Sequence, residues 1–207
     1  MEEIPLFPLG RALFPNGVLH LRIFEVRYLD MIRRCIEKGS EFGVVGLLEG
    51  REVRSPDGVE KLSNAGTMAR IDAWHAPMPA LIHLRCIGTT PFELLDSRQE
   101  KFGLWVGSGA PLDPDASTPI PASLQASADA LGRLIASLQQ EGAPLEAMPV
   151  AAPFRLDECG WVADRWGELL PLTAMQRQNL LRLRDPETRL ERVQHYLRLH
   201  GVLDSKP

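Results

Sequence analysis

The first half of the chain consists of short apolar segments separated by turn residues. Residues 18–23 place leucine, leucine and isoleucine at alternate positions with histidine and arginine between them, which is the period of a half-buried β-strand. Further strands are predicted at 42–48, 67–74, 81–87, 92–95 and 104–106, with turns at 55–58, 64–66 and 77–79. Strands at this spacing favour a small barrel or sandwich over a parallel α/β sheet.

One helix interrupts these strands. Its apolar residues recur at helical spacing and are Tyr28, Leu29, Ile32, Cys35 and Ile36. An acidic residue stands at the predicted start and basic residues stand near the end, an order that the helix dipole favours. Gly39 suits the position just after the last helical turn.

The second half of the chain changes to helical periodicity. Residues 110–122 are rich in proline and are predicted to form a connector. Helices are predicted at about 121–141, from 157 to 170, from Thr173 with Gln176 completing a capping box, and from Asp185–Pro186 to a stop at Gly201. We therefore expect two domains, at 1–112 and 113–207.

Charge and cysteine content narrow the class of protein. The 207 residues carry a formal net charge of −4, which disfavours a nucleic-acid-binding role for the whole chain. No apolar window is long enough to span a membrane, and the acidic, proline-containing N-terminus is unlike a signal peptide. An odd number of widely spaced cysteines favours free thiols in a reducing compartment. The sequence predicts a cytoplasmic protein.

Motifs that carry chemistry are missing from the sequence. It contains no phosphate-binding loop, no nucleophile elbow and no dinucleotide-binding glycine motif opening a helix. The cysteines at positions 35 and 86 lie among apolar neighbours, whereas a nucleophilic thiol needs an electropositive pocket. We predict a protein that is not an enzyme, with no catalytic residue, no metal and no cofactor. An enzyme that uses a cysteine or histidine is the third and weakest hypothesis.

Several segments together resemble one known family. They are I-P-L-F-P-L at 4–9, F-P-N-G at 14–17, L-R-I-F-E-V-R-Y-L-D-M at 21–31, F-G-V-V at 42–45, G-T-M-A-R-I at 66–71, L-P-L-T at 170–173 and the helix at 185–197. They resemble the LON substrate-binding domain, which is the N-terminal domain of the ATP-dependent protease Lon and also occurs as a short stand-alone protein. The proline that this family usually has after Phe-Glu is replaced by Val26.

The resemblance implies an α+β fold, in which a PUA-like small β-barrel with one inserted helix precedes a C-terminal α-helical bundle. The parts of the protease that hydrolyse ATP and peptide bonds have no counterpart in the sequence. Because the first motif starts close to Met1, we expect a complete short protein.

The junction between the strand at 18–23 and the helix after it has a structural interpretation. Glu25 is expected to cap free N–H groups of the helix, and Phe24 and Tyr28 are expected to anchor the helix against the barrel. Arg27 is expected to pair with an acid across the junction. Nothing nearby supplies a nucleophile, so these roles are structural rather than catalytic.

Apolar groups in two predicted loops suggest a binding module. We predict that unfolded polypeptide segments, or a protein partner such as Lon protease, bind at Leu13, Phe14, Pro15, Met78, Pro79 and Leu81. Two alternatives remain open. The same residues could instead cover the core of the barrel, and a PUA-like barrel could bind RNA, which rests on fold analogy alone.

Overall fold

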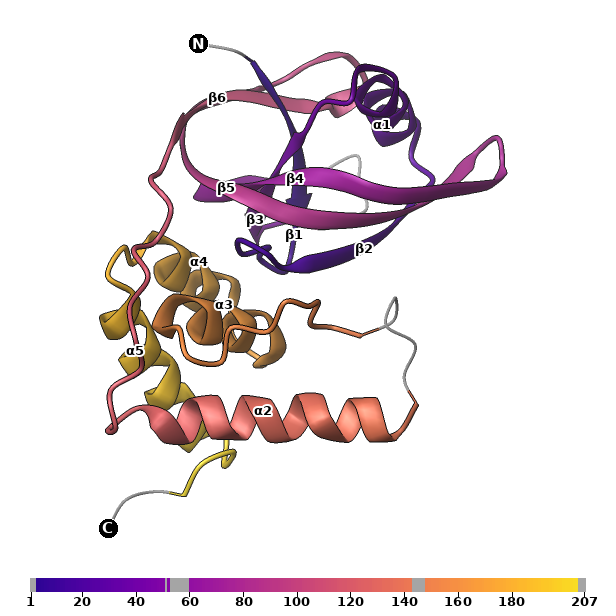
Figure 1. Ribbon diagram of the computed structural model, residues 1–207. Helices are drawn as coiled ribbons and strands as arrows, with labels where there is room; N and C mark the ends of the chain where they lie inside the picture. Colours follow the sequence, from indigo (N-terminus) through magenta and orange to yellow (C-terminus); the bar gives the residue numbers. More distant parts are fainter. Residues whose placement is uncertain (1–2, 51, 53–59, 143–147, 205–207) are drawn as a thin grey trace. The chain divides into compact units, whose positions relative to one another are not determined.

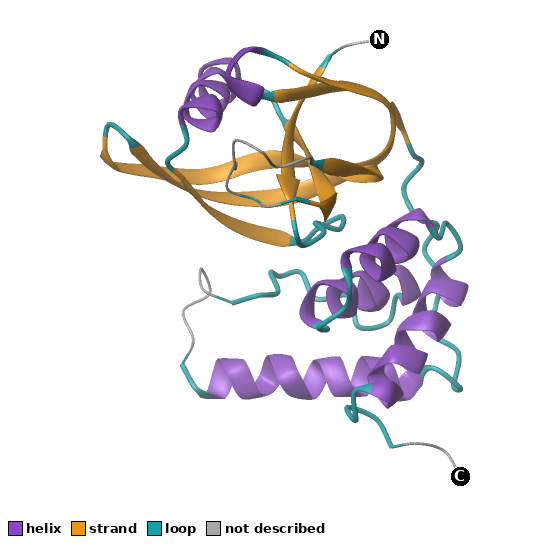
Figure 2. Cartoon of the chain, turned by 180° about the vertical axis from the view of Figure 1, so that it is seen from behind, coloured by secondary structure: helices purple, strands orange, loops and turns teal. Residues whose placement is uncertain are grey.

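The alternating segments of the first half pair into one sheet. The computed structural model describes residues 3–50, 52, 60–142 and 148–204, which fall in two compact units, Met1–Pro114 and Asp115–Pro207 (Figure 1). Within these residues the fold is mixed, with one six-stranded sheet and five α-helices. Figure 2 shows that the strands and the first helix belong to the first unit and the other helices to the second.

The strands of the first unit form a closed circuit of pairings with one strand outside it. They are β1 (Ile4–Leu9), β2 (Val18–Ile23), β3 (Phe42–Glu49), β4 (Lys61–Met78), β5 (Leu81–Gln99) and β6 (Trp105–Pro111). Their order is β2-β5-β4-β3-β1-β6, and β6 also pairs with β5. Among the described strands, β2 pairs with β5 alone.

Strand β1 has two prolines, which on sequence grounds favour an edge strand. That expectation is wrong, because β1 lies between β3 and β6. Its pairings explain why both prolines are tolerated. Pro5 pairs with β6 only, and Pro8 pairs with β3 only, so each proline has an open side where its missing N–H would point.

Two turn and strand predictions in β4 and β5 are also wrong. Residues 64–66 were expected to form a turn but belong to β4, where a Cβ on Gly66 would lie 2.6 Å from the carbonyl oxygen of Val44. Gly66 is therefore required by close packing rather than by a turn. The separate strands expected at 81–87 and 92–95 form one strand, β5, which passes through Pro91. The turn expected at 55–58 lies outside the described residues.

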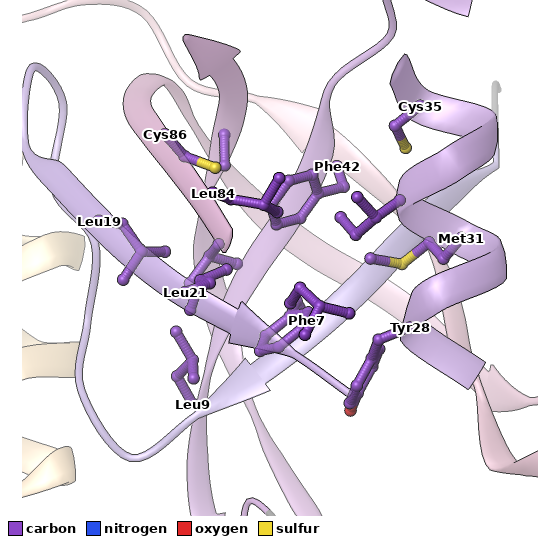
Figure 3. Packing of buried hydrophobic residues seen from close by; sticks show 14 of the residues in the cluster. Phe7, Leu9, Leu19, Leu21, Tyr28, Met31, Cys35, Phe42, Leu84 and Cys86 are labelled. Atoms are coloured by element: carbon purple, nitrogen blue, oxygen red, sulfur yellow. The ribbon is translucent and has the colours of Figure 1, made fainter. Parts of the chain in front are cut away.

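The predicted helix after β2 is α1 (Val26–Lys38), and its apolar face is buried as expected. It ends at Gly39, which has the left-handed conformation (φ 62°) and donates its N–H to carbonyls of the last turn. The helix packs on a core formed with β1–β6, in which the ring of Phe7 lies 4.2 Å from that of Tyr28, centroid to centroid (Figure 3). The core thus joins α1 firmly to the sheet.

The second unit is helical, and two of its four α-helices, α4 and α5, start at the predicted caps. They are α2 (Gln125–Gln140), α3 (Cys159–Leu169), α4 (Ala174–Arg182) and α5 (Pro186–Leu199). Thr173 and Gln176 form the expected capping box, and the carboxylate of Asp185 accepts the N–H of Thr188 at 2.7 Å. These local signals placed both helix starts correctly.

A buried charge cluster joins the segment before α2 to α3 and α5. The Arg189 guanidinium contacts both carboxylate oxygens of Asp115, at 2.8 and 2.9 Å, and one of Asp164 at 2.6 Å. Burial alone would lower the pKa of Arg189, but the two carboxylates raise this pKa by more than burial lowers it. The guanidinium therefore stays charged. A Cβ on Gly160 would lie 2.5 Å from Asp115. The cluster is a structural device of this unit.

Candidate functional site

The junction between β2 and α1 is organised around a buried arginine. Arg27 donates from Nε to Glu25 at 3.2 Å and from Nη1 to the carbonyl oxygen of Gly103 at 2.8 Å, and its Nη2 lies 3.7 Å from Glu60. Its guanidinium also lies 4.5 Å from the centroid of the Tyr28 ring. Gly103 belongs to the short 3₁₀ helix η1 (Lys101–Gly103). Arg27 therefore holds the start of α1 to the segment that precedes β6, and the predicted pairing with an acid is present.

Two of the predicted junction roles are wrong. Glu25 occupies the N-cap position but makes no side-chain capping bond, because its carboxylate pairs with Arg27. Phe24 does not anchor the helix, since 55 % of it is exposed. Phe24 follows Ile23 and shares the strand parity of Arg22, which points away from the core. Tyr28 is buried as predicted, and burial raises the pKa of its hydroxyl.

The first predicted binding loop is part of the core. Leu13 and Phe14 are 3 % and 0 % exposed, so the expectation that they offer apolar surface to a partner is wrong. Thr67 donates its hydroxyl to the carbonyl oxygen of Leu13 at 2.7 Å, and a Cβ on Gly88 would lie 2.2 Å from the carbonyl oxygen of Phe14. The loop is thus fixed against β4 and β5, and only Pro15 of the three candidates stays half-buried.

The second predicted binding loop is exposed. It is the tip of the β4–β5 hairpin, where residues 72–80 are all exposed, Met78 at 58 %, and Leu81 is half-buried. Arg33 of α1 donates to the carbonyl oxygen of Pro79, which places the tip beside α1. The assignment of Met78, Pro79 and Leu81 to polypeptide binding stays a prediction. Met78 and Pro79 have the exposure that such a role requires, and Leu81 has it in part.

Two exposed apolar residues that sequence reasoning missed as surface groups lie near this tip. Phe24 follows Ile23, which pairs with Ile82 of β5, next to Leu81. Val26 is 65 % exposed and lies on the same side of α1 as Arg33, two turns closer to the start of the helix. We call the following set the tip surface: Phe24, Val26, Met78, Pro79 and Leu81. Phe24 is two residues after Arg22, on the polar side of the alternation in β2, and this spacing was the sequence signal that could have revealed its exposure.

A groove of about 510 Å³ is lined by residues 20–23 of β2 and by Phe24, which follows this strand. Its apolar lining comes from both β1 and β2 and includes Phe7, Leu9 and Leu21, with Tyr28 of α1 (Figure 3). Its polar lining residues are Arg11, His20, Arg22, Glu25 and Glu52. A volume of this size lies within the range of about 300–1,000 Å³ that is typical of ligand sites.

The thiols have the properties of core residues. Cys35, Cys86 and Cys159 are buried and unpaired. Burial raises the pKa of Cys35, that of Cys86 to about 12 and that of Cys159 to about 11. At neutral pH these thiols stay protonated, and a thiol is a poor nucleophile in that form.

The described residues contain neither a metal-binding cluster nor a membrane-spanning helix. Among them, no cluster of three or more histidine, cysteine, aspartate or glutamate side chains has the arrangement to hold a metal ion. None of the helices in this part of the chain combines the length and apolar character needed to cross a membrane.

Comparison with known proteins identifies the family. The family model of the ATP-dependent protease La (LON) substrate-binding domain matches residues 3–198. The chain belongs to the LON substrate-binding domain family. The resemblance drawn from the sequence motifs is thereby confirmed, and the match includes both units.

Solved structures of LON-type domains share the fold. A Lon N-terminal domain protein from Xanthomonas campestris is 33 % identical with a TM-score of 0.73, over 94 % of this chain and 98 % of that one. The N-terminal domain of a Mycobacterium avium complex Lon protease is 14 % identical with a TM-score of 0.60, over 94 % and 97 % of the two chains. At that identity the second structure shows a common fold alone. No curated protein matches the chain.

Proposed function

We propose that this LON-type chain is a non-catalytic recognition module that binds unfolded polypeptide segments through the tip surface. Membership of the LON substrate-binding domain family supports a module that recognises protein substrates. In this proposal the closed circuit of strands is a PUA-like barrel and the helical unit is a bundle, corresponding to the predicted domains 1–112 and 113–207. The module works in the cytoplasm, where its thiols stay reduced.

The observation that carries this proposal is the exposed apolar tip surface. Phe24, Val26 and Met78 are 55 %, 65 % and 58 % exposed, which leaves three large apolar side chains in water around one hairpin. Exposed apolar surface that is grouped rather than scattered is typical of an interaction site. Methionine adds a flexible and polarizable side chain, which adapts to partners of different shape.

Unfolded polypeptide is the partner that this surface fits best. An unfolded chain exposes apolar side chains that a folded protein buries, so it can cover the tip surface by the hydrophobic effect. A surface with few fixed polar groups does not select one sequence, as recognition of many unfolded segments requires. Lon protease is a further candidate partner, to which the module would pass the unfolded polypeptides that it binds.

The test measures binding to a permanently unfolded probe. Reduced, carboxymethylated lysozyme with a fluorescent label is titrated with the full chain, and fluorescence anisotropy reports the complex. We expect binding that persists at high salt, and about tenfold weaker binding for Met78→Asp, which puts a charge into the apolar contact. The matched control is Met175→Asp, because Met175 on α4 is 54 % exposed but lies outside the tip surface.

Three results would contradict parts of the proposal. No binding to the unfolded probe by the unmodified chain rejects the function. Equal affinities for the Met78→Asp and Met175→Asp variants reject the tip surface as the site. Binding to transfer RNA that weakens steeply as salt rises, without binding to the unfolded probe, supports the RNA-binding alternative instead.

A further inference from the structure

Strand β2 has a free edge. It pairs with β5 on one side, and no strand among the described residues pairs with its other side. On that other side, the carbonyl oxygen of His20 accepts a hydrogen bond from the Arg11 guanidinium at 3.1 Å. Backbone groups that point to one edge recur every two residues along a strand. The N–H and C=O of Arg22 therefore point to the same free edge as those of His20.

The groove described above runs along this edge. Four consecutive residues of β2, His20 to Ile23, line it, together with Phe7, Leu9 and Gly10 from β1 and the loop after it. Figure 3 shows Phe7 between Leu9 and Leu21 on one side and Tyr28 on the other. The free edge therefore borders an apolar hollow, into which alternate side chains of an added strand would point.

The charged groups that line this groove include two arginines and two glutamates. Both glutamates that line it are engaged, Glu25 with Arg27 and Glu52 with the N–H of Gly10 at 2.7 Å. Arg11 and Arg22 are exposed, and no carboxylate of the described residues forms an ion pair with either of them. Arg22 is therefore able to form an ion pair with an acidic side chain of a bound segment.

We propose that the free edge of β2 binds an extended polypeptide segment by strand addition. Apolar side chains at alternate positions of the segment enter the groove, and a carboxylate of the segment pairs with Arg22. An N–H of the incoming segment replaces the Arg11 guanidinium as the donor to the His20 carbonyl oxygen. Arg11 can give up this hydrogen bond because its side chain is exposed. This inference rests on the proposed function, because it states how the same module holds an unfolded segment.

Strand addition suits a module that takes unfolded chains. Hydrogen bonds between backbones supply affinity that does not depend on the sequence of the segment, while pockets for alternate side chains supply a preference. Phe24 lines the groove and also belongs to the tip surface. A segment bound to β2 can therefore continue onto the tip surface without a break.

The first test separates the backbone from the charge at position 22. The probe is a labelled decapeptide of alternating valine and threonine with one central glutamate, titrated with the full chain. Arg22→Pro removes the N–H at the free edge, where proline is tolerated, and we expect about tenfold weaker binding. Arg22→Ala keeps that N–H and removes the charge, and we expect a loss of about threefold.

A charge exchange keeps the proposal testable where the proline variant fails to fold. The Arg22→Glu variant should bind the glutamate peptide more weakly than the unmodified chain does. It should bind a peptide with lysine in place of glutamate more tightly than the unmodified chain binds that lysine peptide. Amide hydrogen exchange supplies the second readout. The N–H of Arg22 should become protected when the peptide binds, because it then donates to the added strand.

The outcomes distinguish this inference from the proposed function. Binding of the unfolded lysozyme and the decapeptide, without protection of the Arg22 amide and without any change in the proline and glutamate variants, overturns strand addition and leaves the function standing. If neither probe binds the unmodified chain, the function itself fails.

Discussion

Two apolar segments of the first unit look alike in sequence and have opposite environments. Leu13–Pro15 and Met78–Leu81 both combine proline with large apolar side chains, and both were predicted to be exposed loops that contact a partner. In the structure Phe14 is completely buried, whereas Met78 is 58 % exposed. Local composition therefore does not determine whether an apolar loop belongs to the core or to a binding surface.

Distant residues account for the difference. The loop at 10–17 is held by the hydroxyl of Thr67 and by two backbone hydrogen bonds with Gly88, from Asn16 at 2.8 Å and to Gly17 at 2.9 Å. The hairpin tip is held to α1 through the carbonyl oxygen of Pro79, which accepts from an exposed arginine. Buried, multiply bonded backbone resists opening far more than exposed backbone does. The four predictions below test this contrast, from the largest effect on stability to the smallest.

Phe14→Ala should cause the largest loss. It removes a fully buried ring and leaves a cavity, so the free energy of unfolding should fall by about 3–5 kcal/mol. Denaturant unfolding followed by circular dichroism measures the loss. Phe24→Ala is the matched control and should change stability by only about 0.5 kcal/mol, because Phe24 is exposed. Similar losses for both variants would show that the two environments are not as different as the structure indicates.

Gly88→Ala should be the next most damaging change. Its new Cβ would lie 2.2 Å from the carbonyl oxygen of Phe14, so the loop must move away from β5, at a cost of about 1–3 kcal/mol. Gly132→Ala on α2 is the control, where the nearest atom to a Cβ lies at an ordinary 3.4 Å. There the substitution should stabilise the chain by about 0.5–1 kcal/mol, since alanine is the better helix former. A tolerated Gly88→Ala would contradict the close approach.

Thr67→Val tests the hydrogen bond that holds the buried loop. The valine keeps the shape of threonine but leaves the carbonyl oxygen of Leu13 without its donor, and we expect a loss of about 1–2 kcal/mol in unfolding free energy. The same substitution at Thr90, an exposed residue of β5, is the control and should be nearly neutral. An equally small effect at Thr67 would mean that packing alone holds the loop.

The features with local causes were predictable from the sequence. Gly39 marked the end of α1, Thr173 with Gln176 marked the start of α4, and Asp185–Pro186 marked the start of α5. Each of these signals acts within one helical turn, so neighbouring residues suffice to reveal it. The family resemblance rested on motifs and was likewise within reach of the sequence.

The features that depend on strand pairing were not predictable in the same way. The continuation of β5 through Pro91 is set by its neighbours β4 and β6, and the close approach at Gly66 is set by Val44 and Phe92. The free edge of β2 follows from the order of the whole sheet. In the candidate site, Met78, Pro79 and Leu81 were predicted, but the exposure of Phe24 and Val26, the burial of Leu13 and Phe14 and the groove beside β2 needed the fold.

Arg33→Ala should have the smallest effect on stability and a visible effect on dynamics. Arg33 is exposed, and its bond to the Pro79 carbonyl and its ion pair with Asp30 at 3.5 Å lie at the surface, so the loss should be about 0.2–1 kcal/mol. Hydrogen exchange at the amides of residues 78–81 should become faster, because the tip loses its link to α1. The neighbouring variant Arg34→Ala is the control, since Arg34 donates to the Asp30 carbonyl of its own helix, at 3.3 Å, and makes no hydrogen bond to the tip among the described residues. Unchanged exchange at the tip in Arg33→Ala would show that the hairpin holds its position without α1, and the tip surface would then be a property of the hairpin alone.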